Sequence, residues 1–156
     1  PSVTSAPSNG TAGVVDRRGV DSVLQRVLAG LTVVTSISAH SSIAHDAAAL
    51  ATASQDFATA GQGAGQLGSG VPASVSSPVA SRLAALDQLF GTAARCLKRQ
   101  AGVKVPDTRK CVPPLRRANA NDAQLSRELI SLAVYSSQSP KTFESQLVKA
   151  LHKASL

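Results

Sequence analysis

The chain has 156 residues, the length of one ordinary domain, so an enzyme assembled from several domains is not expected. Hydrophobic residues make up 43% and charged residues only 16%, which excludes a disordered polyelectrolyte despite the net charge of +7. Large side chains are scarce, with three Phe, one Tyr, no Trp and no Met. The longest uncharged stretch, 57–81, is interrupted by Gly, Ser and Pro and is not a membrane-spanning segment.

The N-terminal residues 1–18 are predicted to form a flexible arm that precedes a bundle domain over 19–156. The stretch up to Gly13 is rich in Ser, Pro, Gly and Thr. It contains one glycosylation triplet, which begins at Asn9, in the exposed position that such a site needs. The dibasic pair Arg17-Arg18 at the end of the arm fits either a processing site or two solvated charges before a helix.

Two helices are predicted in the first half of the chain. The first begins near Val20, because apolar residues recur there at alternating spacings of four and three. The second covers about 41–59 and is rich in alanine. Five of the eleven glycines fall between Gly61 and Gly70, so regular structure is expected to stop there.

Three further helices are predicted after the glycine-rich stretch. Ser77 and Pro78 have the residue types of a helix start, and Gly102 follows the basic end of the same segment. Pro113-Pro114 opens a fourth helix, and Ser139-Pro140 opens a short fifth one. No segment shows sustained alternation of β-branched residues. The predicted fold is therefore all-α, a single antiparallel bundle of about five helices.

The two cysteines, Cys96 and Cys111, are predicted to form a disulfide. Gly102 and Pro106 lie between them and allow the chain to turn back. Two free thiols are the alternative, whereas a metal site lacks histidines at suitable spacing. A disulfide is typical of an oxidising compartment, so a secreted, extracellular protein is expected.

No catalytic, cofactor or metal site emerges from the motifs, and we expect a protein that is not an enzyme. Residues 63–68 match the dinucleotide pattern G-x-G-x-x-G, but a predicted helix precedes them where the motif needs a strand. Ser41 and His45 can meet on a helix, yet Asp46 points elsewhere and cannot orient the imidazole. A solvated polar face is the better interpretation of these residues.

Half of the cations lie in one stretch, 95–117, with Asp107 as its single acid. These cations are Arg95, Lys98, Arg99, Lys104, Arg109, Lys110, Arg116 and Arg117. All of them except Lys104 are candidate anion contacts, for a fatty-acid carboxylate, a membrane surface, an anionic polysaccharide or a host protein. Nucleic acid is disfavoured because the stretch has no aromatic residue for stacking. A merely solvated end of the bundle is the alternative.

Three short segments resemble the family of fungal hydrophobic surface-binding protein A and cell-wall mannoprotein domains. The first is the dibasic pair before the amphipathic segment Val20–Leu28. The second is a basic turn leading into Ala-Gly-Val, at Leu97–Val103, and the third is the helix segment that begins with Ala-Asn-Asp-Ala at 120–123. The chain differs from the family pattern in its two cysteines and in the basic loop between them.

The resemblance implies a secreted, wall-associated five-helix domain without catalytic residues, which adsorbs to hydrophobic surfaces or encloses a fatty acid. Under this hypothesis, apolar helix faces line a groove or tunnel for lipid, and the basic stretch meets the acid group. The candidate lining residues are Leu24, Val27, Leu31, Leu83, Leu86, Phe90, Leu129 and Phe143. The alternative hypothesis is a secreted effector or interaction protein, whose basic loop over 95–117 contacts an anionic host or cell-wall partner.

Overall fold

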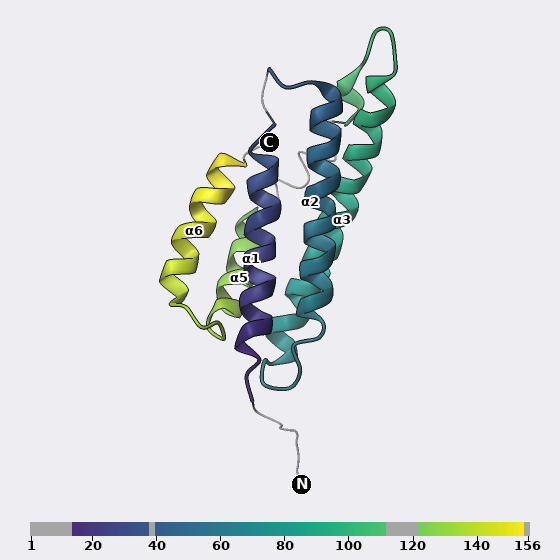
Figure 1. The fold of residues 1–156 in the computed structure, drawn as a ribbon. Coiled ribbons are helices and arrows are strands. Elements are labelled where there is room, and N and C mark those ends of the chain that lie inside the picture. The colour runs from purple at the N-terminus through teal and green to yellow at the C-terminus, as the bar shows by residue number, and fades with distance from the viewer. Residues whose placement is uncertain (1–13, 38–39, 112–121, 155–156) are drawn as a thin grey trace.

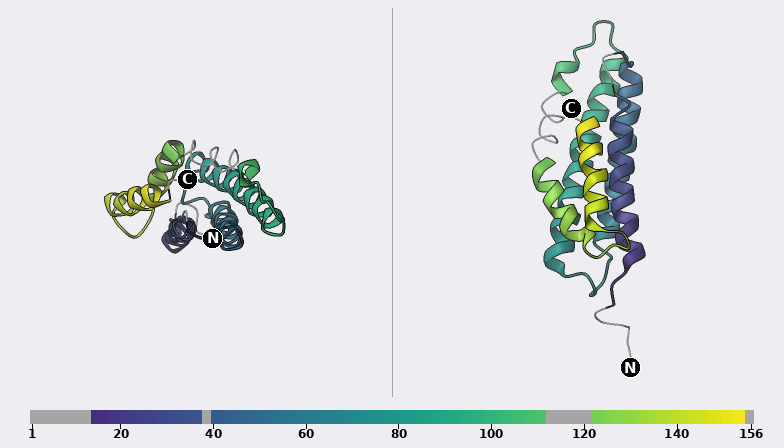
Figure 2. Two further views of the ribbon diagram at one scale, coloured as in Figure 1. Left: turned by 90° about the horizontal axis from the view of Figure 1, so that it is seen from above. Right: turned by 90° about the vertical axis from the view of Figure 1, so that its left-hand side faces the viewer.

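The computed structural model describes residues 14–37, 40–111 and 122–154. Within these ranges the protein is all-helical, which confirms the predicted fold class. Its five α-helices are α1 (Arg17–Val34), α2 (Ile43–Ala64), α3 (Ala73–Ala101), α5 (Asp122–Ala133) and α6 (Pro140–Lys153), with a short 3₁₀ turn η2 (Thr108–Cys111). Helix α2 packs along α1 and α3, while α5 and α6 complete the bundle beside α3 and α1 (Figures 1 and 2).

Helix α1 begins earlier than predicted. The Asp16 carboxylate accepts a hydrogen bond from the Gly19 amide at 2.9 Å and caps the helix, which places Arg17 and Arg18 in its first turn. Arg17 also donates from Nη1 to the carbonyl of Ser136 at 2.8 Å, which ties α1 to the segment before α6. Helix α1 thus starts two residues before the predicted domain boundary at 19, and Asn9 lies outside the described residues.

The predicted glycine break was wrong in its first part, because α2 continues through Gly61 and Gly63 to Ala64. Helix α3 approaches α2 so closely at Gly61 that an added Cβ would lie 3.3 Å from the Leu83 Cβ. Glycine here serves close helix packing rather than a turn. The glycine that does need its conformational freedom is Gly68, whose φ is 77° in the connection to α3.

The predicted start of α3 was also wrong. The helix begins at Ala73, and the Pro72 carbonyl accepts from the Val75 and Ser76 amides at 2.9 and 3.0 Å. Pro78 lies inside the helix and has no N–H to donate to the carbonyl one turn earlier. This surface of the helix is exposed, so water can donate to that carbonyl instead. The predicted end before Gly102 is confirmed, whereas the proposed start at 113–114 lies outside the described residues.

The fifth predicted helix is confirmed as α6. Ser139 caps it by accepting a hydrogen bond from the Lys141 amide at 3.2 Å, and Pro140 is its first residue. Proline suits this position because the first turn of a helix has no internal partner for its N–H.

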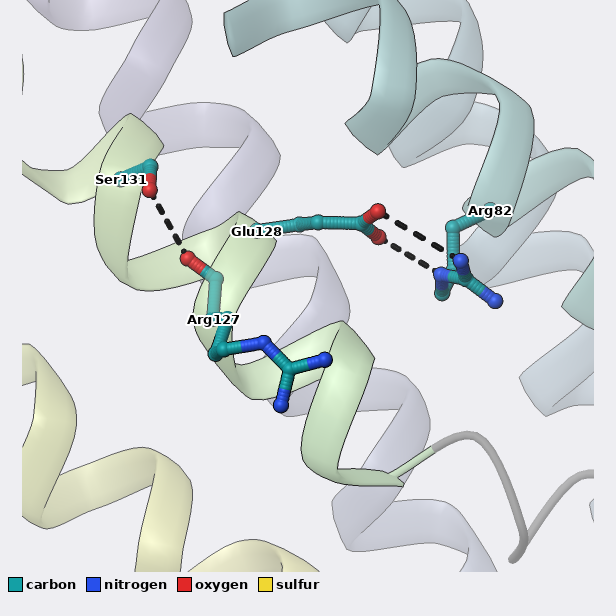
Figure 3. Close-up of polar contacts among 4 residues, drawn as sticks. All are labelled: Arg82, Arg127, Glu128 and Ser131. Carbon is teal, nitrogen blue, oxygen red and sulfur yellow. Dashed lines mark hydrogen bonds and ion pairs between the residues drawn. The ribbon is translucent and has the colours of Figure 1, made fainter.

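A bidentate ion pair joins α3 to α5 (Figure 3). Arg82 Nε lies 2.6 Å from Glu128 Oε1, and Arg82 Nη2 lies 3.4 Å from Oε2. Each side chain is only 18% exposed, so solvent screens the pair less than it screens a surface ion pair. The side chain of the neighbouring Arg127 is exposed, and the Arg127 carbonyl accepts from Ser131 Oγ at 2.9 Å.

Glu128→Gln is expected to lower the free energy of unfolding by about 1–3 kcal/mol, because it removes the charge from a bidentate ion pair that is largely shielded from solvent. Urea denaturation followed by circular dichroism measures the change. Arg127→Ala is the matched control on the same helix, since the Ser131 hydrogen bond reaches only its backbone. Equal stability of the Glu128 variant and this control would show that the pair adds nothing to the α3–α5 contact.

Candidate functional site

The eight predicted lipid-lining residues are all buried in one hydrophobic core. Leu31 is the most exposed of them, at 6%, and the rings of Phe57 and Phe90 stack with centroids 5.3 Å apart in the same core. None of the eight lines any of the three surface grooves described below. Their role as lipid contacts stays a prediction, and in this structure they hold the helices together.

The groove between α2 and α3 is floored by small apolar side chains and has a volume of about 430 Å³. Four alanines of α2 face two alanines of α3 across the groove. The lining residues are Ala44, Ala47, Ala48, Ala51, Ala94, Arg95, Lys98 and Ala101. Alanine side chains end at Cβ, so two closely packed helices still leave a depression between them. We call it the α2/α3 groove.

Sequence reasoning missed this groove, although its signal is present in α2. Ala44, Ala47, Ala48 and Ala51 follow the spacing of one helix face. Alanine on one face is equally consistent with tight packing against a neighbour, as at Gly61. Only the positions of both helices distinguish an open face from a covered one.

Two cations of the predicted basic stretch, Arg95 and Lys98, line the α2/α3 groove. Arg95 Nη2 lies 3.4 Å from Thr92 Oγ1, one turn earlier on α3. The space beside it is left by Gly91, where an added Cβ would lie 3.4 Å from Arg95 Nη1. Both cationic side chains are exposed, so the groove combines an apolar floor with a positive rim.

The other described cations of the basic stretch lie in the segment closed by the disulfide. The disulfide is confirmed between Cys96 and Cys111, with Cα atoms 5.7 Å apart. The Asp107 amide donates to Gln100 Oε1 at 2.8 Å and attaches the loop to the end of α3. Asp107 also forms an ion pair with Arg109 at 3.1 Å. This side-chain hydrogen bond from Arg109 lowers the pKa of Asp107 below its ordinary value.

The structure thus divides the predicted anion contacts into two groups. Arg95 and Lys98 belong to the groove, whereas Arg109 and Lys110 are exposed on η2 beyond the end of α3. Arg99 is exposed in the last turn of α3. Arg116 and Arg117 lie outside the described residues.

Two other grooves are more polar. One of about 380 Å³ lies between α1 and α6, with Thr32, Gln146, Lys149 and Lys153 among its lining residues. A smaller one of about 160 Å³ lies between the start of α1 and the end of α2 and includes Asp16 and Arg26. Both have a mixed lining, because Leu28 and Ala150 also line the first and Val23 and Leu67 also line the second.

The polar residues at the start of α2 form caps rather than a catalytic arrangement. The Ser42 hydroxyl accepts from the His45 amide at 3.0 Å, and His45 Nε2 lies 3.2 Å from Ser36 Oγ. Asp46 accepts from Ser41 Oγ at 2.6 Å, away from the imidazole, as its spacing predicted. In the described part of the chain, no three His, Cys, Asp or Glu side chains gather as metal ligands.

The glycines of the pattern at 63–68 fall in the last turn of α2 and the connection after it. Carbonyl groups and the negative end of the helix dipole lie there, which is the wrong end for a pyrophosphate.

Among the helices of the described residues, none is long and apolar enough to cross a membrane.

No protein-family model, curated protein or solved structure matches the chain. The resemblance to the hydrophobic surface-binding family therefore stays a prediction, and the site is interpreted from its own chemistry.

Proposed function

We propose that this is a non-enzymatic binding protein that holds a single-chain anionic amphiphile, such as a fatty acid, in the α2/α3 groove. The observation that carries the proposal is the pairing of an alanine floor with a cationic rim. An acyl chain lying on the floor loses contact with water, and each square ångström of apolar surface removed adds about 25 cal/mol. The carboxylate then accepts charge-assisted hydrogen bonds from Arg95 and Lys98.

The proposal locates the ligand on the outside of the bundle rather than in a central tunnel. The predicted tunnel residues pack the core, so a chain between them would require the helices to separate. The groove needs no such opening, and its volume of about 430 Å³ lies in the usual range for small-molecule sites. Because a disulfide is typical of oxidising compartments, we place this activity outside the cell.

Displacement of a fluorescent fatty acid tests the proposal. Arg95→Ala combined with Lys98→Ala is expected to weaken binding about tenfold, through loss of charge-assisted hydrogen bonds at the rim. Ala51→Phe is expected to weaken binding at least as much, because its ring would fill the groove. Organic extraction of the purified protein followed by mass spectrometry identifies any ligand that it retains.

Two controls match these variants. Lys149→Ala with Lys153→Ala removes two cations from the groove between α1 and α6, and Ala85→Phe places a ring on an exposed part of α3 outside the α2/α3 groove. Both are expected to bind like the unmodified protein. Absence of binding to the unmodified protein, or equal loss in controls and groove variants, would contradict the proposal.

A further inference from the structure

The loop after α3 exposes two valines at its tip. Val103 is 48% exposed and Val105 is 84% exposed, the highest value among the large hydrophobic residues that the structure describes. Single exposed valines are common on proteins, but two at alternate positions of one projecting loop form a small apolar tip. The loop extends beyond the start of α2, at the top of both side views (Figures 1 and 2).

This tip is held outward by the chain itself. The disulfide closes the base of the loop on α3, and the Asp107 amide is bonded to Gln100. The Val103 amide donates to the Gln100 carbonyl at 3.2 Å, which fixes the first residues of the turn. The valines are therefore presented by a closed loop, and little conformational freedom is lost if they enter another apolar phase.

Cations surround the apolar tip. Lys104 lies between the two valines, and Arg109 and Lys110 follow on η2, where the Arg109 side chain is 90% exposed. The single acid of the loop, Asp107, is already paired with Arg109. Apolar residues at a tip with cations around them match the layering of an anionic bilayer, in which phosphates lie above the hydrocarbon.

We propose that the loop between Cys96 and Cys111 docks this protein on an anionic lipid bilayer. Val103 and Val105 enter the boundary between headgroups and acyl chains, while Lys104, Arg109 and Lys110 contact lipid phosphates. A soluble polysaccharide offers the cations a partner but offers the valines none. A bilayer offers hydrocarbon to the valines and phosphates to the cations. Docking by this loop does not depend on ligand binding in the α2/α3 groove.

Cosedimentation with vesicles of phosphatidylcholine containing about a quarter phosphatidylserine, in about 0.1 M NaCl, tests the docking. The protein is expected to bind these vesicles and to bind pure phosphatidylcholine weakly. Lys104→Ala with Lys110→Ala should lower the partition coefficient about 25-fold, since each cation near the surface contributes about fivefold. Val103→Ser with Val105→Ser should lower it about tenfold or more.

Matched controls use the same residue types elsewhere on the surface. Val134→Ser with Val148→Ser removes two valines that are 60% and 57% exposed, and Lys149→Ala with Lys153→Ala removes two lysines. Both pairs should retain vesicle binding. The Val103 and Val105 variant should keep its fatty-acid displacement and its melting temperature, which separates this proposal from the groove and from unfolding.

Two results would overturn the docking. Vesicle binding that is unchanged by the two serines would show adsorption by charge alone, without insertion. Failure to bind anionic vesicles, together with retention on an anionic polysaccharide resin that both lysine substitutions abolish, would assign the cations to a polysaccharide instead.

Discussion

Replacement of Phe57 by alanine is expected to lower the free energy of unfolding by about 3–5 kcal/mol. The Phe57 ring is fully buried and stacks on Phe90, with centroids 5.3 Å apart. Helix α1 closes over it at Gly30, where an added Cβ would lie 3.0 Å from Phe57 Cε1. The chain contains only three Phe and no Trp, so the neighbours have few large side chains with which to fill the space.

Urea denaturation of Phe57→Ala measures this loss, with Val148→Ala as an exposed control. The result also tests where a ligand binds. If the core is filled, the variant loses stability but keeps fatty-acid displacement at the α2/α3 groove. A loss below about 1 kcal/mol would indicate a loosely packed interior, as the predicted lipid tunnel requires.

Removal of the disulfide by Cys96→Ala with Cys111→Ala is expected to cost about 3 kcal/mol, the chain-entropy value for closing a loop of about 15 residues. For a domain of this length the melting temperature should fall by about 6–12 °C. Cys111 is fully buried, so the variant also loses packing against the end of α3. Thermal melting followed by circular dichroism gives the shift.

The unmodified protein melted in the presence of a reductant is the companion measurement, and it should approach the double variant. Equal melting temperatures with and without the bond would show that the loop is already ordered by its hydrogen bonds alone. Under the docking proposal, the reduced protein should also bind anionic vesicles less tightly, because the valines lose their fixed presentation.

Much of the fold was predictable because it depends on local patterns. The alternating spacing of apolar residues predicts the buried stripes of α1 and α3, and capping chemistry predicts the Ser139-Pro140 start of α6. The disulfide was predictable because only two cysteines are present and turn residues separate them. The errors occurred at Gly61 and Pro78, where residues that usually interrupt helices lie within them.

The candidate sites were only partly predictable. The basic stretch indicated an anion contact, but its division between groove and loop depends on the end of α3 at Ala101. The exposure of Val103 and Val105 has no sequence signal, since valine is more often buried than exposed.

The sequence by itself determined that the protein is a small-residue helical domain with one disulfide and a basic segment around it. The tertiary structure decided which small residues are covered. Gly61 meets α3 at contact distance, whereas Ala44, Ala48 and Ala51 are exposed beside the alanines and the two cations near the other end of α3. Local periodicity specifies which face of a helix is apolar, but the position of the neighbouring helix decides whether that face is packed or open. That position follows from the whole set of contacts and not from any one segment.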